Sequence, residues 1–129
     1  MENLSYAAKI AVLKVLNDIV YADNVVNEKE VAYLSKVAEA FGVVDSYQEE
    51  LPNCVTLQAL SEIKTLSPIQ KERIAKLMGE MIVVDGDINY NEVKFYNEVC
   101  DACHIEQDFH TENYPDATHS GPFVNPEDV

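Results

Sequence analysis

The chain has 129 residues, 47% of them hydrophobic, and a formal net charge of −14; this size suits one compact domain. So acidic a surface repels nucleic acid and anionic lipid, which leaves divalent cations and basic protein surfaces as the expected partners. No basic segment followed by an apolar run opens the sequence, and its three cysteines suit a reducing compartment, so we expect a cytoplasmic protein without membrane insertion.

Apolar residues recur every three or four positions along most of the chain, as they do on one face of a helix. This spacing predicts helices over 5–22, 28–41, 55–66, 68–84 and 90–103, with a turn or short helix over 45–52. Val31 in the second predicted helix and Leu57 in the third are expected to face the core. Since no segment has the alternation of a strand, the fold class is predicted to be all-α.

Two acidic turns resemble each other in sequence. Asp85 is followed by Asn89 and Glu92, and 62 residues earlier Asp23 is followed by Asn27 and Glu30. Each Asn can cap the next helix, and each Glu stands at the third position of that helix, as in a capping box. The matching register predicts two repeated helix-turn-helix units that pack into a single-domain helical bundle.

The composition changes after Ile105. Residues 106–129 contain six acidic residues and no Lys or Arg, and they include Pro115, Pro122 and Pro126. Prolines at this density exclude a long helix. We therefore expect a helical domain over 1–105 and an acidic irregular C-terminal tail over 106–129.

The segment from Asp85 to Glu92 is similar to the later half of an EF-hand loop, in which a final Glu binds calcium. The earlier half is missing, because its first two ligand positions fall on the apolar Met81 and Val83. Two interpretations stay open. The acidic residues of the turns either cap helices and bond turn amides, or together they hold a partly hydrated divalent cation.

Cys100, Cys103 and His104 have the spacing of a c-type haem attachment site. Zinc is the other metal to consider, but it prefers four ligands and only three such side chains lie close together in the sequence. Both cysteines fall on the apolar face of the last predicted helix, which favours small buried hydrophobes instead. No pattern of a catalytic centre is present, so we expect a protein that is not an enzyme and needs no organic cofactor.

The double acidic turn, with the sequence Leu66-Ser67-Pro68-x-Gln70-Lys71 opening the second unit, resembles the tellurite-resistance TerB-like family over about residues 5–105. The first copy departs from the family pattern, since Asn24 stands in the glycine position and Val25 replaces an acid. The resemblance implies an all-helical domain of two repeats in a stress-response system. It also implies an acidic site for a divalent cation, with these candidate ligands: Asp23, Glu30, Asp85, Asp87 and Glu92.

The leading hypothesis is therefore a non-enzymatic TerB-like module that binds a divalent cation, calcium or magnesium before others, and a protein partner. The alternative is a metal-free adaptor between proteins, in which the same acids serve only as caps. A redox, haem or zinc protein using Cys100, Cys103 and His104 is the third hypothesis.

Overall fold

The computed structural model describes residues 4–22, 26–84, 88–107 and 109. Within these residues all regular structure is helical, which confirms the predicted all-α bundle. The elements are α1 (Tyr6–Val20), α2 (Glu28–Ala40), α3 (Tyr47–Glu50), the 3-10 helix η1 (Leu51–Asn53), α4 (Thr56–Lys64), α5 (Pro68–Val83) and α6 (Tyr90–Cys103). None of the described helices is long and apolar enough to cross a bilayer.

Helix α1 is the centre of the bundle. It contacts α2, α4, α5 and α6, and its contact with α4 is the most extensive of all. Its buried face is wider than the spacing of apolar residues predicts, because Ile10, Ala11 and Leu13 are buried as well. The remaining side carries polar residues such as Lys14 and Asp18, so α1 is an amphipathic helix whose wide apolar face packs against its neighbours.

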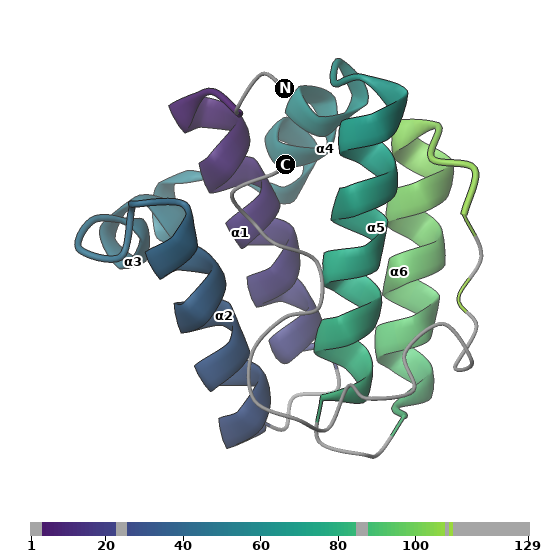
Figure 1. The fold of residues 1–129 in the computed structure, drawn as a ribbon. Coiled ribbons are helices and arrows are strands. Elements are labelled where there is room, and N and C mark those ends of the chain that lie inside the picture. Colours follow the sequence, from purple (N-terminus) through teal and green to yellow (C-terminus); the bar gives the residue numbers. More distant parts are fainter. Residues whose placement is uncertain (1–3, 23–25, 85–87, 108, 110–129) are drawn as a thin grey trace.

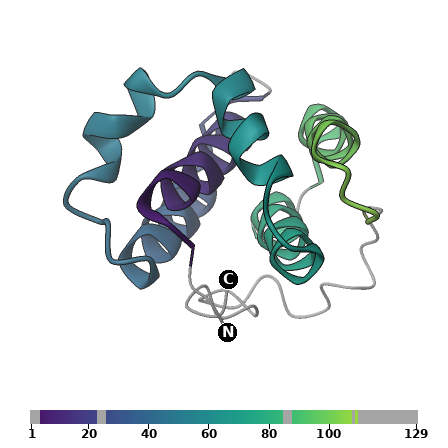
Figure 2. The ribbon, with the colours of Figure 1, turned by 90° about the horizontal axis from the view of Figure 1, so that it is seen from above.

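Four helices lie side by side with their ends in register (Figure 1). Helices α1 and α5 end, and α2 and α6 begin, at one end of the bundle, which we call the turn end. Seen from above, α1 and α2 lie on one side and α5 and α6 on the other, with α4 between the two pairs (Figure 2). Helix α4 contacts both α1 and α6 and so joins the pairs.

Local sequence signals set most helix boundaries. The Ser5 side chain accepts a hydrogen bond from the Ala8 amide and begins α1. Ser67 and Gln70 form a complete capping box at the start of α5, where Pro68 occupies the first helical position. Beyond the end of α2, Gly42 adopts a φ of 77°, the left-handed conformation that glycine takes without steric cost.

Two predicted core residues are in fact on the surface. Leu57 in the first turn of α4 is 78% exposed, and Val31 on α2 is also exposed. Ala59 and Ile63 face the core from α4 instead, since the crossing with α1 selects that side of a short helix. The equivalence of the two helix-turn-helix units stays a prediction, as does the domain boundary after residue 105.

Candidate functional site

The two asparagines predicted as caps begin α2 and α6 with the same geometry. The Asn27 Oδ1 atom accepts hydrogen bonds from the amides of Lys29 at 2.8 Å and Glu30 at 3.3 Å. The Asn89 Oδ1 atom accepts from Asn91 and Glu92 at the same two distances. These caps fix the first turn of each helix and thereby place Glu30 and Glu92 at the turn end.

Both of these glutamates are almost completely buried. Glu30 is 2% exposed and Glu92 is 3% exposed. Burying a carboxylate is costly unless hydrogen bonds or opposite charge compensate for the lost water, and the first turn of a helix supplies part of this compensation through its dipole. All buried side-chain oxygen and nitrogen atoms of the described residues have hydrogen-bond partners. Two of the five predicted ion ligands are thus held inside the protein.

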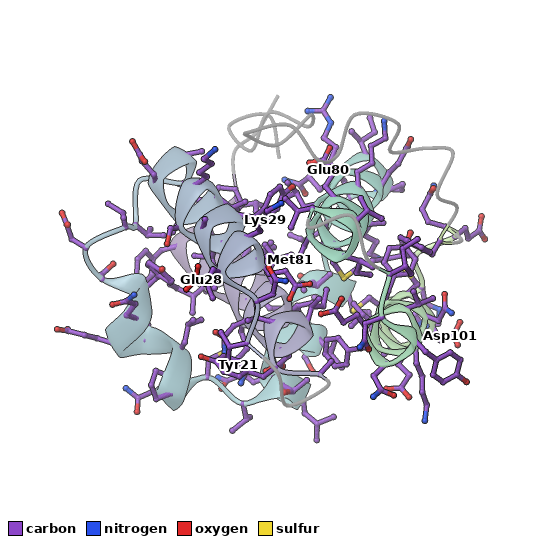
Figure 3. The ribbon with its side chains drawn as sticks, turned by 90° about the horizontal axis from the view of Figure 1, so that it is seen from below. Tyr21, Glu28, Lys29, Glu80, Met81 and Asp101 are labelled. Atoms are coloured by element: carbon purple, nitrogen blue, oxygen red, sulfur yellow. The ribbon has the colours of Figure 1, made fainter. Side chains whose placement is uncertain are left out.

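A third buried glutamate lies on the last turns of α5. Glu80 is 3% exposed, and its Oε2 atom accepts a hydrogen bond of 2.5 Å from the hydroxyl of the buried Tyr33 on α2. This short bond joins α5 to α2, and a bond to a charged acceptor is stronger than one between neutral groups. Figure 3, which looks onto the turn end, shows Glu80 on α5 across from the start of α2 at Glu28 and Lys29.

Asp18 on α1 corresponds to Glu80 in the proposed repeat but has a different role. Its Oδ1 atom forms an ion pair of 2.9 Å with Lys14, and its Oδ2 atom accepts a 2.8 Å hydrogen bond from the Thr56 hydroxyl. Thr56 is the first residue of α4. Asp18 therefore connects α1 to the start of α4.

The other predicted ligands, Asp23, Asp85 and Asp87, lie outside the described residues. Among the residues that the structure does describe, no three His, Cys, Asp or Glu side chains form a group that could hold a metal ion. A cation site built on Glu30 or Glu92 would therefore have to include acids of the turns. The first two ligand positions of an EF-hand loop would fall on Met81 and Val83. Both are buried residues of α5, which explains why the earlier half of such a loop is missing.

The cysteine pair lies in the core, as the small-hydrophobe interpretation predicts. Cys100 and Cys103 are both buried, and the Cys103 thiol donates to the Leu60 carbonyl at 3.4 Å. Burial raises the pKa of the Cys103 thiol, while the charges of Lys71 and Lys64 oppose this effect. His104 caps α6 in the left-handed conformation, with φ of 59°. Because Cys100 and Cys103 are buried in the core, both thiols serve in packing.

Sequence reasoning did not single out Tyr33, and it did not predict that Glu80 is buried. The positions of both residues relative to the apolar residues of their helices do indicate burial. Glu80 falls between Leu77 and Met81 on the inward arc of α5, and Tyr33 lies four residues before Val37 on α2. A polar residue in an apolar stripe indicates a buried hydrogen bond, but the partner on another helix cannot be identified from spacing.

The comparisons with known proteins agree with this architecture. Residues 1–53, from α1 through η1, match the family model for tellurite resistance protein TerB, which confirms the TerB-like resemblance over these residues. A crystal structure of a protein of unknown function from Porphyromonas gingivalis W83 is similar, with a TM-score of 0.76 and 21% identity over 92% of this chain and 93% of that chain. At this identity the likeness shows the fold alone. No curated protein matches the sequence.

Proposed function

We propose that this TerB-like chain is a non-enzymatic module that binds a divalent cation at its turn end and presents that end to a protein partner. The observation that carries the proposal is the pair Glu30 and Glu92. Both are buried, and both are fixed in a first helical turn by an asparagine cap. Asp23, Asp85 and Asp87 precede them in sequence and complete the proposed ligand set.

The donor chemistry selects the class of ion. Carboxylate and amide oxygens are hard ligands, which suit calcium or magnesium better than zinc. A cation would also compensate for the loss of water around Glu30 and Glu92, because it adds opposite charge where two carboxylates have been buried. The match to tellurite resistance protein TerB supports a place in a stress response of that type.

The partner is argued from exposed apolar side chains next to the same turns. Tyr21 follows α1, Val26 precedes α2, and Ile88 and Tyr90 stand at the start of α6; all four are exposed, and Tyr90 is 78% exposed. Aromatic and apolar residues on a surface mark protein contacts more often than chance. Since the chain is strongly acidic, the partner surface should combine basic and apolar residues.

The test is the melting temperature of the chelated protein with added calcium, magnesium, manganese or zinc. An ion that binds only the folded state stabilises it by about 2.7 kcal/mol at a hundred times its Kd. We expect a saturable rise with calcium or magnesium that Asp85→Asn and Glu92→Gln both abolish. Glu98→Gln is the matched control, because Glu98 lies exposed on the same helix as Glu92 and should leave the rise unchanged.

A metal-free adaptor is the second candidate, and the exposed residues Tyr21, Val26, Ile88 and Tyr90 favour it because an apolar contact needs no ion. If no ion changes the melting temperature, or if the control variant loses the response equally, the cation proposal is wrong. The carboxylates would then act as helix caps, and the turn end would be a protein contact only.

A further inference from the structure

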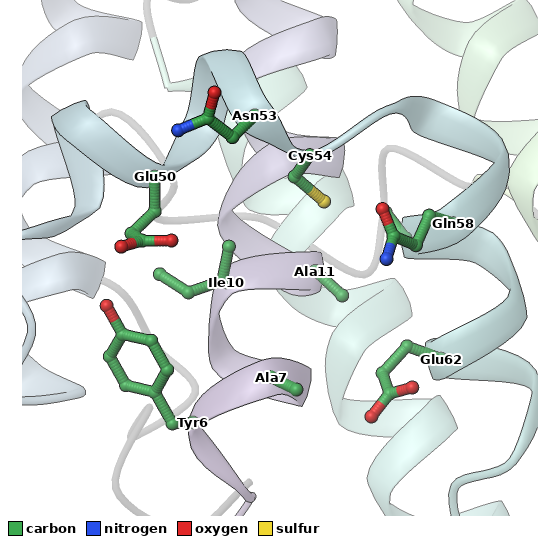
Figure 4. A pocket seen from close by; sticks show the side chains of 10 residues that line it. Tyr6, Ala7, Ile10, Ala11, Glu50, Asn53, Cys54, Gln58 and Glu62 are labelled. Atoms are coloured by element: carbon green, nitrogen blue, oxygen red, sulfur yellow. The ribbon is translucent and has the colours of Figure 1, made fainter.

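A pocket lies toward the opposite end of α1 from the turn end. It has a volume of about 250 Å³ and is formed by the first half of α1, the segment from α3 to η1, and α4. Ile10, Ala11 and Ala59 are buried and make its floor. Figure 4 shows this pocket from close by. Because its volume is below that of most drug-sized sites, a ligand that fits it must be small.

Two carboxylates lie on opposite sides of this apolar floor. Glu50 belongs to α3 and Glu62 to α4, and Ala7, Ile10 and Ala11 of α1 lie between them (Figure 4). Glu62 is half-buried, whereas Glu50 is exposed. The pocket thus has negative charge at two separated places and an aliphatic surface between them.

The remaining polar groups do not neutralise this charge. The Tyr6 ring, whose hydroxyl donates to Ser46 at 3.3 Å, the amides of Asn53 and Gln58 and the thiol of Cys54 complete the wall, and none of the described residues that line the pocket is basic. The Lys14 charge acts on Cys54, but the Lys14 ammonium is paired with Asp18 at 2.9 Å. The pocket is therefore complementary to a cation with an apolar body.

We propose that this pocket binds a short aliphatic diamine in its diammonium form, with one ammonium group at Glu50, the other at Glu62, and the methylene chain on Ile10 and the flanking alanines. A single metal ion does not match this arrangement, because it requires oxygen ligands close to one point. An ammonium group needs only an acceptor at each end and gains from the apolar contact between them.

The first test is an NMR titration of the full chain with 1,4-diaminobutane, with butylamine and 1,4-butanediol as probes that lack one or both charges. We expect saturable shift changes at Ala7, Ile10, Cys54 and Ala59 with the diamine. Butylamine should bind about two- to fivefold more weakly, as expected for the loss of one partly exposed ion pair. Butanediol should produce no saturable change.

The matched variants separate the pocket from the general acidity of the protein. Glu50→Gln with Glu62→Gln should weaken diamine binding at least about tenfold. Glu39→Gln with Glu49→Gln removes the same charge from exposed residues outside the pocket lining and should leave the affinity unchanged. Equal losses in the two double variants, or changes spread over the whole surface, would show that the diamine is only a counter-ion.

Cys54 supplies a second measurement inside the pocket. Cys100 and Cys103 are buried, whereas Cys54 is partly exposed, so mild thiol reagents report on Cys54. Burial raises the pKa of the Cys54 thiol, so the exchange is followed at mildly alkaline pH. Cysteamine is the better leaving group with any thiol, so the preference of Cys54 for cystamine over 2-hydroxyethyl disulfide is compared with that of free 2-mercaptoethanol. Cys54 should show a larger preference than the free thiol, and this excess should disappear in the Glu50→Gln, Glu62→Gln variant. Persistence of this excess in the variant would overturn the proposal, whatever the outcome of the cation test at the turn end.

Discussion

At the scale of single residues, the hydrogen bond between Tyr33 and Glu80 is a buried polar contact between two helices. Both residues are buried, and the 2.5 Å hydrogen bond spans 47 positions in the sequence. A buried hydrogen bond of this kind adds little net stability when it is intact, but losing one partner removes a hydrogen bond from the other inside the protein. It therefore fixes how α2 lies against α5.

We expect Tyr33→Phe to lower the free energy of unfolding by about 1–3 kcal/mol, since it removes a donor to the buried Glu80 carboxylate. Urea denaturation at neutral pH measures the change. Tyr47→Phe is the control, because the Tyr47 hydroxyl has only partly buried contacts of 3.3 Å with Ser35 and 3.4 Å with Gln48. If the two variants prove equally stable, the interhelical bond does not contribute as argued.

At the scale of helices, capping residues predicted helix starts more reliably than hydrophobic spacing predicted which side chains are buried. The asparagine caps of α2 and α6 and the capping box of α5 lie where the sequence predicts them. These signals are local, since each cap bonds amides two or three positions further along the chain. By contrast, Leu57 was expected in the core and is exposed, because the side of α4 that becomes buried depends on its contact with α1.

We expect Asn89→Ala to destabilise the protein by about 1 kcal/mol, and Asn89→Asp to cost much less, because Asp can still accept from the amides of Asn91 and Glu92. Thermal unfolding without added ions measures both. If Asn89→Ala and Asn89→Asp lower the stability equally, the side-chain amide of Asn89 is needed for something other than capping.

At the scale of the whole molecule, the candidate site was only partly predictable. Glu30 and Glu92 could be chosen from sequence because each follows its Asn cap by three residues. Their near-complete burial could not, since it depends on four helices ending or beginning at one end of the bundle. Asp23, Asp85 and Asp87 stay predictions, because they lie outside the described residues.

The stability of the whole fold should also respond to alkaline pH through Cys103. Burial raises the pKa of this thiol above its ordinary value of 9.0, so the unfolded chain loses the proton at lower pH than the folded chain does. The resulting stabilisation is fully present at neutral pH and disappears as pH rises through the folded-state pKa. We expect the difference in unfolding free energy between the wild type and Cys103→Ser to shrink above about pH 9. A difference that stays constant across this range would contradict the linkage.

The central position of α1 makes its packing depend on helices that follow later in the chain. Helix α1 is made first during synthesis, but its most extensive partner, α4, begins only at Thr56, and α5 and α6 follow later still. Until those helices emerge, an apolar helix such as α1 has few surfaces to pack against. The segment that matches tellurite resistance protein TerB ends at residue 53, before α4 begins. We therefore expect that segment, made alone, to be much less stable than the full chain, because it lacks α4, α5 and α6.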